Sequence, residues 1–562
     1  MRSANKPLNL AAKTTGLRYW MGRVLEECER VSADFSADPV HDLRVSLRRC
    51  RSMADGMMAM DPDREWKAMK KAGQRLFRRL GALRDVQIMM EWIQKLHPRP
   101  IEADAPVVFL EGSAAGGSAG EGARSTLSGS PTNGQRDPAR TLLQILQGRE
   151  IEQKREARAA LEEFDRKEWR QWSSSLPVRA ARIRPGSPVF KHLALERWAA
   201  ARELHTRALR NRSQVGFHTL RIGIKRIRYM VENFLPVEHK AWSNDLKHMQ
   251  DLLGEVHDLD VLWATALACQ VFADEESRKS WHAQIIEERT KRIEEYRKRT
   301  LGPDSRWNVW RAGLPQAKQI QAIAMRRMKL WAKALDTDFA HSERVARLAV
   351  ALYDGLVGAG LIAGGGTGAA SQNGAASNAR DTLSLAGLLH DVGKAKGNRG
   401  HHKESLELIK SHETPLGWKT EVMTRAALVA RFHAGALPSR SHKALRDLSP
   451  EEQKITMQLA AILRLANAFD VAHDGHVRKV QIENADTGKR RTNGFLRKPA
   501  KLGPNEALII GAEGFGVGSR TAQAVAAERY LLETVLRRPV IVKAMKSVEP
   551  RRVVTEAKRI AS

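Results

Sequence analysis

The chain has 562 residues and a formal net charge of +30 at pH 7, because 94 Lys and Arg residues outnumber 64 Asp and Glu residues. A field of that sign attracts polyanions, namely nucleic acid, polyphosphate, phosphorylated metabolites or anionic membrane surfaces, but it does not select among them. Three scattered cysteines give no indication of a disulfide framework, which fits a reducing cytoplasm. The lack of a signal-peptide core or of an 18-residue apolar stretch predicts a cytoplasmic chain without a membrane span.

The first part of the chain is predicted to be helical. Apolar residues recur at spacings of three and four over residues 8–95, and again from about 140 to about 300. Between these stretches, residues 99–138 form a Gly- and Ser-rich insertion with too little apolar content to fold. We therefore expect two sets of helices separated by a flexible segment.

Helical patterns also fill most of the second part. They return at about residue 317 and are interrupted by a second soft insertion at 357–380. Strand patterns occur only toward the end, at 476–484, at 506–512 and in the segment PVIVKAM, and a helical pattern separates the last two. The predicted fold class is therefore mainly α, with a small α/β tail.

A short pattern occurs twice in the basic first part. Residues 41–51 read HDLRVSLRRCR and residues 218–228 read HTLRIGIKRIR. The first is followed by LGALRDVQIM at 80–89 and the second by LGEVHDLDVL at 253–262. Such self-similarity indicates two helical halves built from one ancestral unit.

Positive side chains share one face of each repeated helix, since they lie at positions i, i+3, i+7 and i+10. Like charges this close repel one another unless an anion or an acid lies between them, and Asp85 and Asp258 are candidate acid partners. One basic run alone is usually a solvated face, but its repetition favours an anion-binding site. The residues are His41, Arg44, Arg48 and Arg51, repeated as His218, Arg221, Lys225 and Arg228.

The order HDLRVSLRRCRS, LGALRDVQ, FHTLRIGIKRIRYM and LLGEVHDLDVL resembles the CHAD family of helical domains over residues 8–300, with the insertion at 99–138 between its halves. The resemblance implies a two-half helical bundle with a basic groove that binds inorganic polyphosphate, and an association with polyphosphate granules. The groove residues that it implies are His41, Arg44, Arg48, Arg49 and Arg51 from one half, and His218, Arg221, Lys225, Arg226 and Arg228 from the other.

Histidine and aspartate residues recur along the second part, each on or beside an apolar helical pattern. Such ligands suit a divalent ion, Mg²⁺, Mn²⁺, Fe²⁺ or Zn²⁺, which can activate a phosphoryl group. Lys394 could neutralise a substrate phosphate, and Val392 and Gly393 are expected to break the helix beside the His-Asp pair. The candidate metal ligands are His341, His390, Asp391, His402, His433 and Asp470.

The same segments resemble the HD phosphohydrolase superfamily over about 322–480. LLHDVGK, HHKESLELI, ARFH and AAILRLANAFD are similar, in that order, to the C-terminal HD region of the exopolyphosphatase/guanosine pentaphosphatase family. The resemblance implies an HD domain at 317–480, a small α/β domain at 481–548, and catalytic roles for His390, Asp391 and Lys394.

Two departures from that family matter. Glu404 stands where a second His of a His-x-His turn is often found, so that His401 could replace His402 as a ligand. The family's actin-like catalytic domains have no counterpart in the chain, so exopolyphosphatase activity does not transfer with the resemblance.

Two functions compete at this point. The first is a polyphosphate-binding protein with a metal-dependent HD phosphohydrolase domain that acts on polyphosphate or a phosphorylated nucleotide. The alternative is a non-enzymatic scaffold or sensor at polyphosphate granules. A nucleic-acid binder rests on the charge alone, because few aromatic residues interleave the basic helices. The substrate, the metal and any homo-oligomeric state are left open by the sequence.

Overall fold

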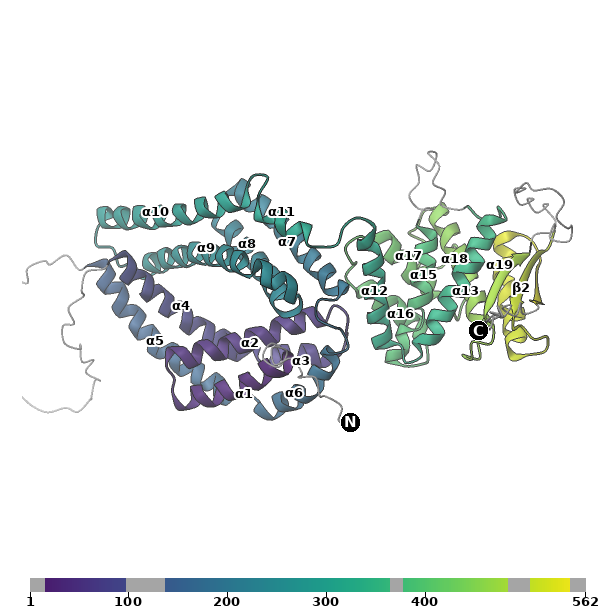
Figure 1. Cartoon of the computed structure of the whole chain (residues 1–562), viewed down its shortest axis with the longest axis horizontal. Helices are drawn as coiled ribbons and strands as arrows, with labels where there is room; N and C mark the ends of the chain where they lie inside the picture. Colours follow the sequence, from purple (N-terminus) through teal and green to yellow (C-terminus); the bar gives the residue numbers. More distant parts are fainter. Residues whose placement is uncertain (1–15, 98–136, 364–377, 484–505, 546–562) are drawn as a thin grey trace, which may run out of the picture. The chain divides into compact units, whose positions relative to one another are not determined.

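The computed structural model describes residues 16–97, 137–363, 378–483 and 506–545 (Figure 1). The chain divides into two compact units, one formed by Met1–Met58 with Asp63–Pro315 and the other by Ala59–Pro62 with Gln316–Ser562. Most of the two predicted flexible insertions lies outside the described residues. No helix in the described ranges is long and apolar enough to cross a membrane.

The first unit is built from helices alone among its described residues. Several begin at side-chain caps that satisfy free N–H groups of the first turn, such as Asp137 before α5 and Ser213 before α8. The helices are α1 (Leu17–Ala33), α2 (Ala37–Met57), α3 (Arg64–Ala72), α4 (Gln74–Leu96), α5 (Pro138–Glu162), α6 (Arg166–Ala180), α7 (Pro188–Asn211), α8 (Gln214–Phe234), α9 (Pro236–Ala268), α10 (Glu275–Thr300) and α11 (Arg306–Ala312).

The predicted sequence repeat corresponds to a structural repeat. The two basic motifs lie on α2 and α8, and the LGxxxD motifs that follow them lie on α4 and α9. Figure 1 shows α1–α6 and α7–α11 as two groups of helices, and these groups meet where α2 packs against α8 and α4 against α9. The four repeated helices therefore face one another in the middle of this unit.

The second unit is a helical bundle followed by a small sheet. Its helices are α12 (Lys318–Leu335), α13 (Phe339–Gly358), α15 (Ala379–Leu389), the 3₁₀ helix η2 (Val392–Lys396), α16 (His401–Ser411), α17 (Thr420–Arg431), α18 (Pro450–Phe469) and α19 (Arg520–Leu536). Its strands are β1 (Lys479–Glu483), β2 (Leu508–Glu513) and β3 (Val540–Met545). The prediction of a mainly α fold with a few late strands is confirmed.

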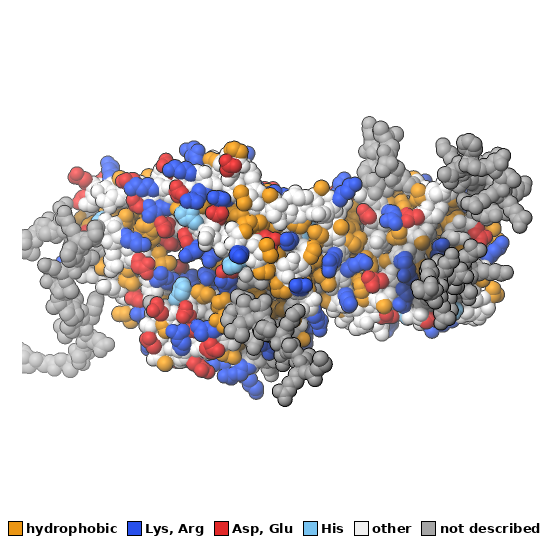
Figure 2. All heavy atoms as spheres, viewed as in Figure 1, with side chains coloured by type: hydrophobic (Ala, Val, Ile, Leu, Met, Phe, Trp, Pro, Cys, Tyr) orange, Lys and Arg blue, Asp and Glu red, His pale blue; other side chains and the backbone are white. Residues whose placement is uncertain are grey.

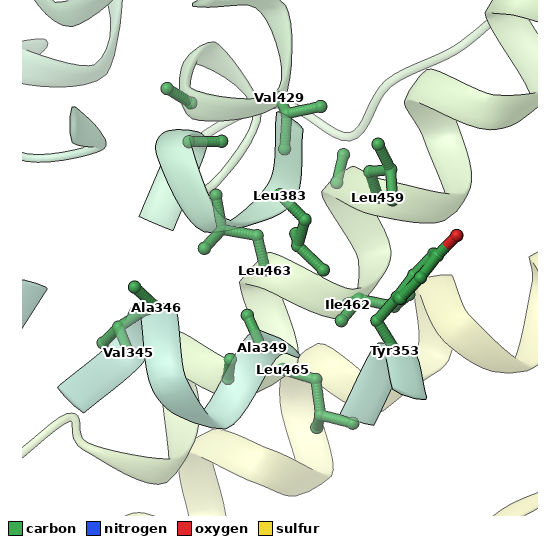
Figure 3. Close-up of a cluster of buried hydrophobic side chains, with 14 of the residues drawn as sticks. Val345, Ala346, Ala349, Tyr353, Leu383, Val429, Leu459, Ile462, Leu463 and Leu465 are labelled. Carbon is green, nitrogen blue, oxygen red and sulfur yellow. The ribbon is translucent and has the colours of Figure 1, made fainter. Parts of the chain in front are cut away.

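One hydrophobic core joins the bundle and the sheet. Figure 3 shows Ala349 of α13, Leu383 of α15, Val429 of α17 and Ile462 of α18 packed together. Alternate residues of β2 and the apolar face of α19 belong to the same core. The sheet has the order β1-β2-β3, with β1 antiparallel and β3 parallel to β2, and α19 forms the crossover of the parallel pair. The α/β tail is thus fixed to the helices that carry the histidine set.

Two glycines allow the helices around that set to approach closely. A Cβ at Gly387 would lie 2.6 Å from the Cα of Ala346, so α15 touches the backbone of α13 there. A Cβ at Gly393 would lie 2.0 Å from the carbonyl oxygen of His401, so η2 packs on the start of α16. Helix α15 already ends at Leu389, which corrects the expectation that Val392 and Gly393 break it. Gly393 instead permits a contact between two helices.

Candidate metal centre and basic cluster

The His390-Asp391 pair lies between α15 and η2, where the chain leaves the α-helix. Both residues are buried, at 0% and 3% exposure. Nδ1 of His390 donates to the carbonyl oxygen of Gly387 at 2.8 Å, which leaves its Nε2 buried without a hydrogen-bond partner among the described residues. That Nε2 lies 3.4 Å from Oδ2 of Asp391. A buried lone pair beside a carboxylate is the arrangement that a metal ion satisfies.

Asp391 stands between two pairs of histidines. Its Oδ2 faces Nε2 of His390 and, at 3.9 Å, Nε2 of His341. Its Oδ1 faces Nε2 of His401 at 3.3 Å and Nε2 of His433 at 3.6 Å. In each of the two groups the candidate ligand atoms all lie within 4.8 Å of one another, as metal ligands do. One carboxylate is therefore shared by two candidate cation sites.

His401 and His433 present lone pairs to each other. Nδ1 of His401 donates to the carbonyl oxygen of Asn398 at 2.9 Å, and Nδ1 of His433 donates to that of Ala430 at 2.7 Å. A carbonyl oxygen can only accept, so the remaining Nε2 atoms carry lone pairs when the rings are neutral. These two Nε2 atoms lie 3.0 Å apart. Two facing lone pairs at this distance need a proton or a metal cation between them.

The ionisation states suit metal binding. Burial raises the pKa of Asp391, but His390, His401, His433 and Lys394 together hold it below its ordinary value. Burial lowers the pKa of His390, and it lowers the pKa of His433 well below the usual range. The hydrogen bond to Asp391 raises the pKa of His401. At neutral pH the centre therefore holds an anionic Asp391 and neutral, buried His390 and His433, the forms that bind metals. The raised pKa of His401 favours a proton on this ring until a metal cation replaces it.

Asp470 lies directly against the ring of His341. It lies 129 positions from His341, yet its Oδ2 accepts a hydrogen bond from Nδ1 of that ring at 2.8 Å. The same oxygen accepts from Nε of Arg344 at 2.8 Å, and Oδ1 accepts from the backbone N–H of Gly475 at 2.9 Å. Asp470 does not join the two groups around Asp391. Its contacts are those of a carboxylate that orients a histidine ligand from behind.

The structure brings His401 rather than His402 to Asp391. The ring of His402 lies against Gly435 instead, where a Cβ would come 2.9 Å from its Nε2. Glu404 points elsewhere and pairs with Lys396 at 2.8 Å. Lys394 is at the centre, where its Nζ forms an ion pair with Oδ2 of Asp391. Of the alternatives that the sequence left open for this turn, the geometry favours the first histidine.

Sequence reasoning missed two side chains at the centre. Arg344 pairs with Asp470, and Oδ1 of Asn467 lies 3.0 Å from Nε2 of His341. Arg344 follows His341 by three positions, and Asn467 precedes Asp470 by three. Each therefore lies about one helical turn from a predicted residue. That spacing was the available signal.

In the first unit, the repeated helices bring cations and two acids together. Burial, together with the neighbouring charges of Arg221, Arg48 and Arg44, lowers the pKa of Lys225 to about 7. Burial raises the pKa of Asp258 to about 6, against the opposing effect of Arg221 and Lys225. We call Arg44, Arg48, Arg221, Lys225, Asp85 and Asp258 the basic cluster, since the charges of Arg44, Arg221 and Lys225 also act on Asp85. The cluster sets four half-buried cations against two acids, of which Asp258 is half-buried and Asp85 exposed.

Two histidines lie beside the basic cluster. Nδ1 of His218 lies 3.2 Å from Nδ1 of His257. Burial and then Arg221 lower the pKa of His257 to about 4, and burial lowers that of His218. His257, in the second LGxxxD motif, is therefore a neutral member of this neighbourhood. Its counterpart in the first half, Arg84, pairs with Glu91 at 2.9 Å.

The other predicted groove residues have different surroundings. Arg49 forms an ion pair with Glu232, and Arg228 lies 4.0 Å from the same acid. Arg51 donates to the carbonyl oxygen of Lys70 at 2.6 Å. His41 is exposed. The three arginines therefore already have partners within the fold, and His41 faces solvent.

Arg226 lies apart from the cluster, in a pocket between α2, α3, α7 and α8. The pocket is lined in addition by Ser52, Asp55, Gly56, Lys70, Leu193, Arg197, Tyr229 and Met230. On the face of this unit seen in Figure 2, Lys, Arg and His side chains are interleaved with acidic ones, so the positive charge is distributed rather than confined to one patch.

Comparison with known families yields two matches. The family model for the CHAD domain matches residues 17–267, and that for Ppx/GppA phosphatase, domain III, matches residues 323–509. No curated protein matches the chain. The first match spans the repeated helices of the basic cluster, and the second spans the histidine set together with β1 and the start of β2.

Proposed function

Because the chain joins a CHAD domain to a Ppx/GppA phosphatase domain III, a polyphosphate-related and phosphatase-like combination, we propose that it is a polyphosphate-binding, metal-dependent phosphohydrolase. Residues 8–300 bind the polyanion, and the HD-type site within 317–480, with the α/β region 481–548 attached, hydrolyses polyphosphate or a phosphorylated nucleotide. Localisation to polyphosphate granules follows from the first activity and stays a prediction.

One observation supports the catalytic part most strongly. The Nε2 atoms of His401 and His433 face each other at 3.0 Å while both Nδ1 protons are committed to backbone carbonyls. Nε2 of His390, on the other side of Asp391, is buried without a partner among the described residues. Leaving such groups unpaired costs about 1–3 kcal/mol each. Divalent cations on both sides of Asp391 would satisfy all of them.

The residues divide into three roles in this proposal. His341, His390 and Asp391 hold one ion, and Asp391, His401 and His433 hold the other. A divalent ion bound there supplies Lewis acidity toward a phosphoryl group. Lys394, now paired with Asp391, can turn to a substrate phosphate once metal neutralises the carboxylate. Asp470 and Arg344 hold the ring of His341 in place.

The basic cluster supports the binding part. Arg44, Arg48, Arg221 and Lys225 repel one another, and two acids of weakened charge do not balance them. A chain of phosphates offers one negative charge per unit, closely spaced, which suits cations that line two facing helices. The low aromatic content, 6% of residues, argues against a single-stranded nucleic acid, whose bases stack on aromatic rings.

The direct test is phosphate release by the full chain. Protein purified without chelators would be analysed for bound metal, then incubated with Mn²⁺ or Mg²⁺ and a panel of polyphosphates and phosphorylated nucleotides. We expect stoichiometric metal and release from at least one substrate. Absence of bound metal, together with no gain in thermal stability from Mn²⁺, Mg²⁺ or Zn²⁺, would remove the enzyme proposal.

A non-enzymatic polyphosphate sensor is the second candidate, and one observation favours it. Both acids of the centre already have cationic partners, Lys394 at Asp391 and Arg344 at Asp470. These ion pairs compete with metal for the carboxylates. Polyphosphate binding with bound metal but no phosphate release from any substrate would establish this alternative.

A further inference from the structure

Arg464 is a buried arginine of α18 that contacts the turn carrying His433. Only 5% of the residue is exposed to solvent. Nη1 donates to the carbonyl oxygen of Phe432 at 3.1 Å and to that of Gly435 at 3.2 Å. These carbonyls lie on either side of His433. One guanidinium nitrogen therefore ties together the two ends of the turn that follows α17.

Glu528 of α19 holds the other side of the same guanidinium. Its Oε2 accepts from Nε of Arg464 at 2.6 Å, and its Oε1 accepts from Nη2 at 3.1 Å. Such a two-point contact fixes the plane of the guanidinium as well as its position. The Glu528 side chain is 33% exposed, so this acid reaches the buried arginine from the rim of the core.

The turn has little freedom of its own to compensate. Gly435 has φ +74°, a backbone conformation that other residues rarely adopt, and His402 packs directly against it. The carbonyl oxygen of Ala430, in the last turn of α17, sets the ring orientation of His433, whose Nε2 faces Oδ1 of Asp391 at 3.6 Å. A shift of this backbone therefore moves Nε2 away from the shared carboxylate.

We propose that Arg464 and Glu528 are positioning residues for His433, so that the C-terminal helix α19 helps to build the metal centre. The proposal rests on the proposed function in one respect, the role of His433 as a ligand. Arg464 contacts the backbone carbonyls of Phe432 and Gly435, and Glu528 acts through Arg464, so both residues act on His433 through the backbone of the turn. Removing the charge of Glu528 would leave a buried guanidinium without its counter-ion and free to leave the two carbonyls.

The first measurement is Co²⁺ binding, because the visible spectrum of Co²⁺ reports the number and geometry of its ligands. Glu528→Gln keeps the shape of the side chain, and Arg464→Lys keeps the charge but cannot reach both carbonyls and the acid. We expect each variant to bind Co²⁺ roughly 10- to 100-fold more weakly, the usual effect of an outer-shell partner, with an altered spectrum. Glu451→Gln, an exposed acid on the same helix as Arg464, is the matched control.

A double-mutant cycle separates positioning from a general loss of stability. If Glu528 acts through His433, Glu528→Gln should change Co²⁺ affinity less than about twofold in a His433→Ala background. An equal loss in both backgrounds, or a wild-type affinity and spectrum in the single variant, would overturn the proposal.

The second measurement needs no metal. Hydrogen exchange at the amides of 432–436 in metal-free full-length protein should be faster in Glu528→Gln than in wild type, and unchanged in Glu451→Gln. We call the contacts of Arg464 with Glu528 and with the turn 432–435 the brace. Unchanged hydrogen exchange in Glu528→Gln would refute the brace, independently of the result of the Co²⁺ measurement. If the wild type binds no Co²⁺ but exchange accelerates in the variant, the brace stands and the proposed function fails.

Discussion

The basic cluster and the candidate metal centre are both electrostatically unbalanced, but with opposite sign. In the first unit, the half-buried Lys225 lies beside the half-buried Arg44, Arg48 and Arg221, so positive charge is in excess. In the second, Asp391 is surrounded by imidazole nitrogens whose lone pairs face inward, so electron donors are in excess. Each is costly to bury alone. An anion would relieve the first site and a cation the second, so the proposed function assigns polyphosphate and a divalent metal to separate sites.

The largest expected effect comes from removing the shared acid. Asp391→Ala should abolish phosphate release and strongly reduce bound metal, because both groups of ligands lose their common carboxylate. Polyphosphate binding should remain, since the basic cluster is untouched. Phosphate release, metal content and polyphosphate affinity would be measured side by side, with Asp381→Ala, an exposed acid of α15, as the control. Loss of polyphosphate binding in Asp391→Ala would contradict the independence of the two sites.

The second prediction concerns charge reversal in the basic cluster. Arg48→Glu combined with Lys225→Glu should weaken polyphosphate binding at least about tenfold and flatten its salt dependence, since each ionic contact contributes roughly 0.7–0.9 to the log–log slope in nucleic acids. Bound metal should not change. Binding would be titrated at several salt concentrations beside Lys279→Glu with Lys298→Glu, two exposed positions on α10. Equal weakening in that control would mean that only net charge matters.

The two sites should also differ in their response to pH. Lys225, with a pKa of about 7, loses its proton as the pH rises from 6 to 8, and Asp258, with a pKa of about 6, gains negative charge over the lower part of that range. Both changes disfavour an anion, so polyphosphate affinity should fall as the pH rises. Lys225→Arg should flatten the profile, because arginine stays charged. Long chains at constant ionic strength keep the ligand's own charge nearly constant; a flat wild-type profile would refute this assignment.

The smallest expected effect tests which of two adjacent histidines belongs to the candidate metal centre. His401→Ala should lower metal affinity, because Nε2 of His401 faces both His433 and Asp391. His402→Ala should change it less than about twofold, since that ring packs on Gly435 instead. Mn²⁺ titration of the two variants is the comparison, and a larger loss in His402→Ala would reverse the assignment.

The sequence by itself determined the features that depend on local geometry. Helical periodicity places Arg44 and Arg48 on one face of α2, and the repeat places Arg221 and Lys225 on the matching face of α8. The late strands also followed from their apolar pattern, and β2 occupies Leu508–Glu513 close to the predicted 506–512. Both signals arise within a few residues of chain, where the backbone conformation alone decides which side chains lie together.

Only the tertiary structure decided which of these side chains meet. Adjacent residues on a helix point about 100° apart, so the choice of His401 over His402 depends on how α16 is placed. Gly393 of η2 helps to set that placement through its close contact with the start of α16. Asp470 faces His341 and Arg344 because α18 packs against α13. The brace of Arg464 by Glu528 joins residues 64 positions apart. These contacts depend on helix packing across one shared core, and no short-range pattern in the sequence encodes them.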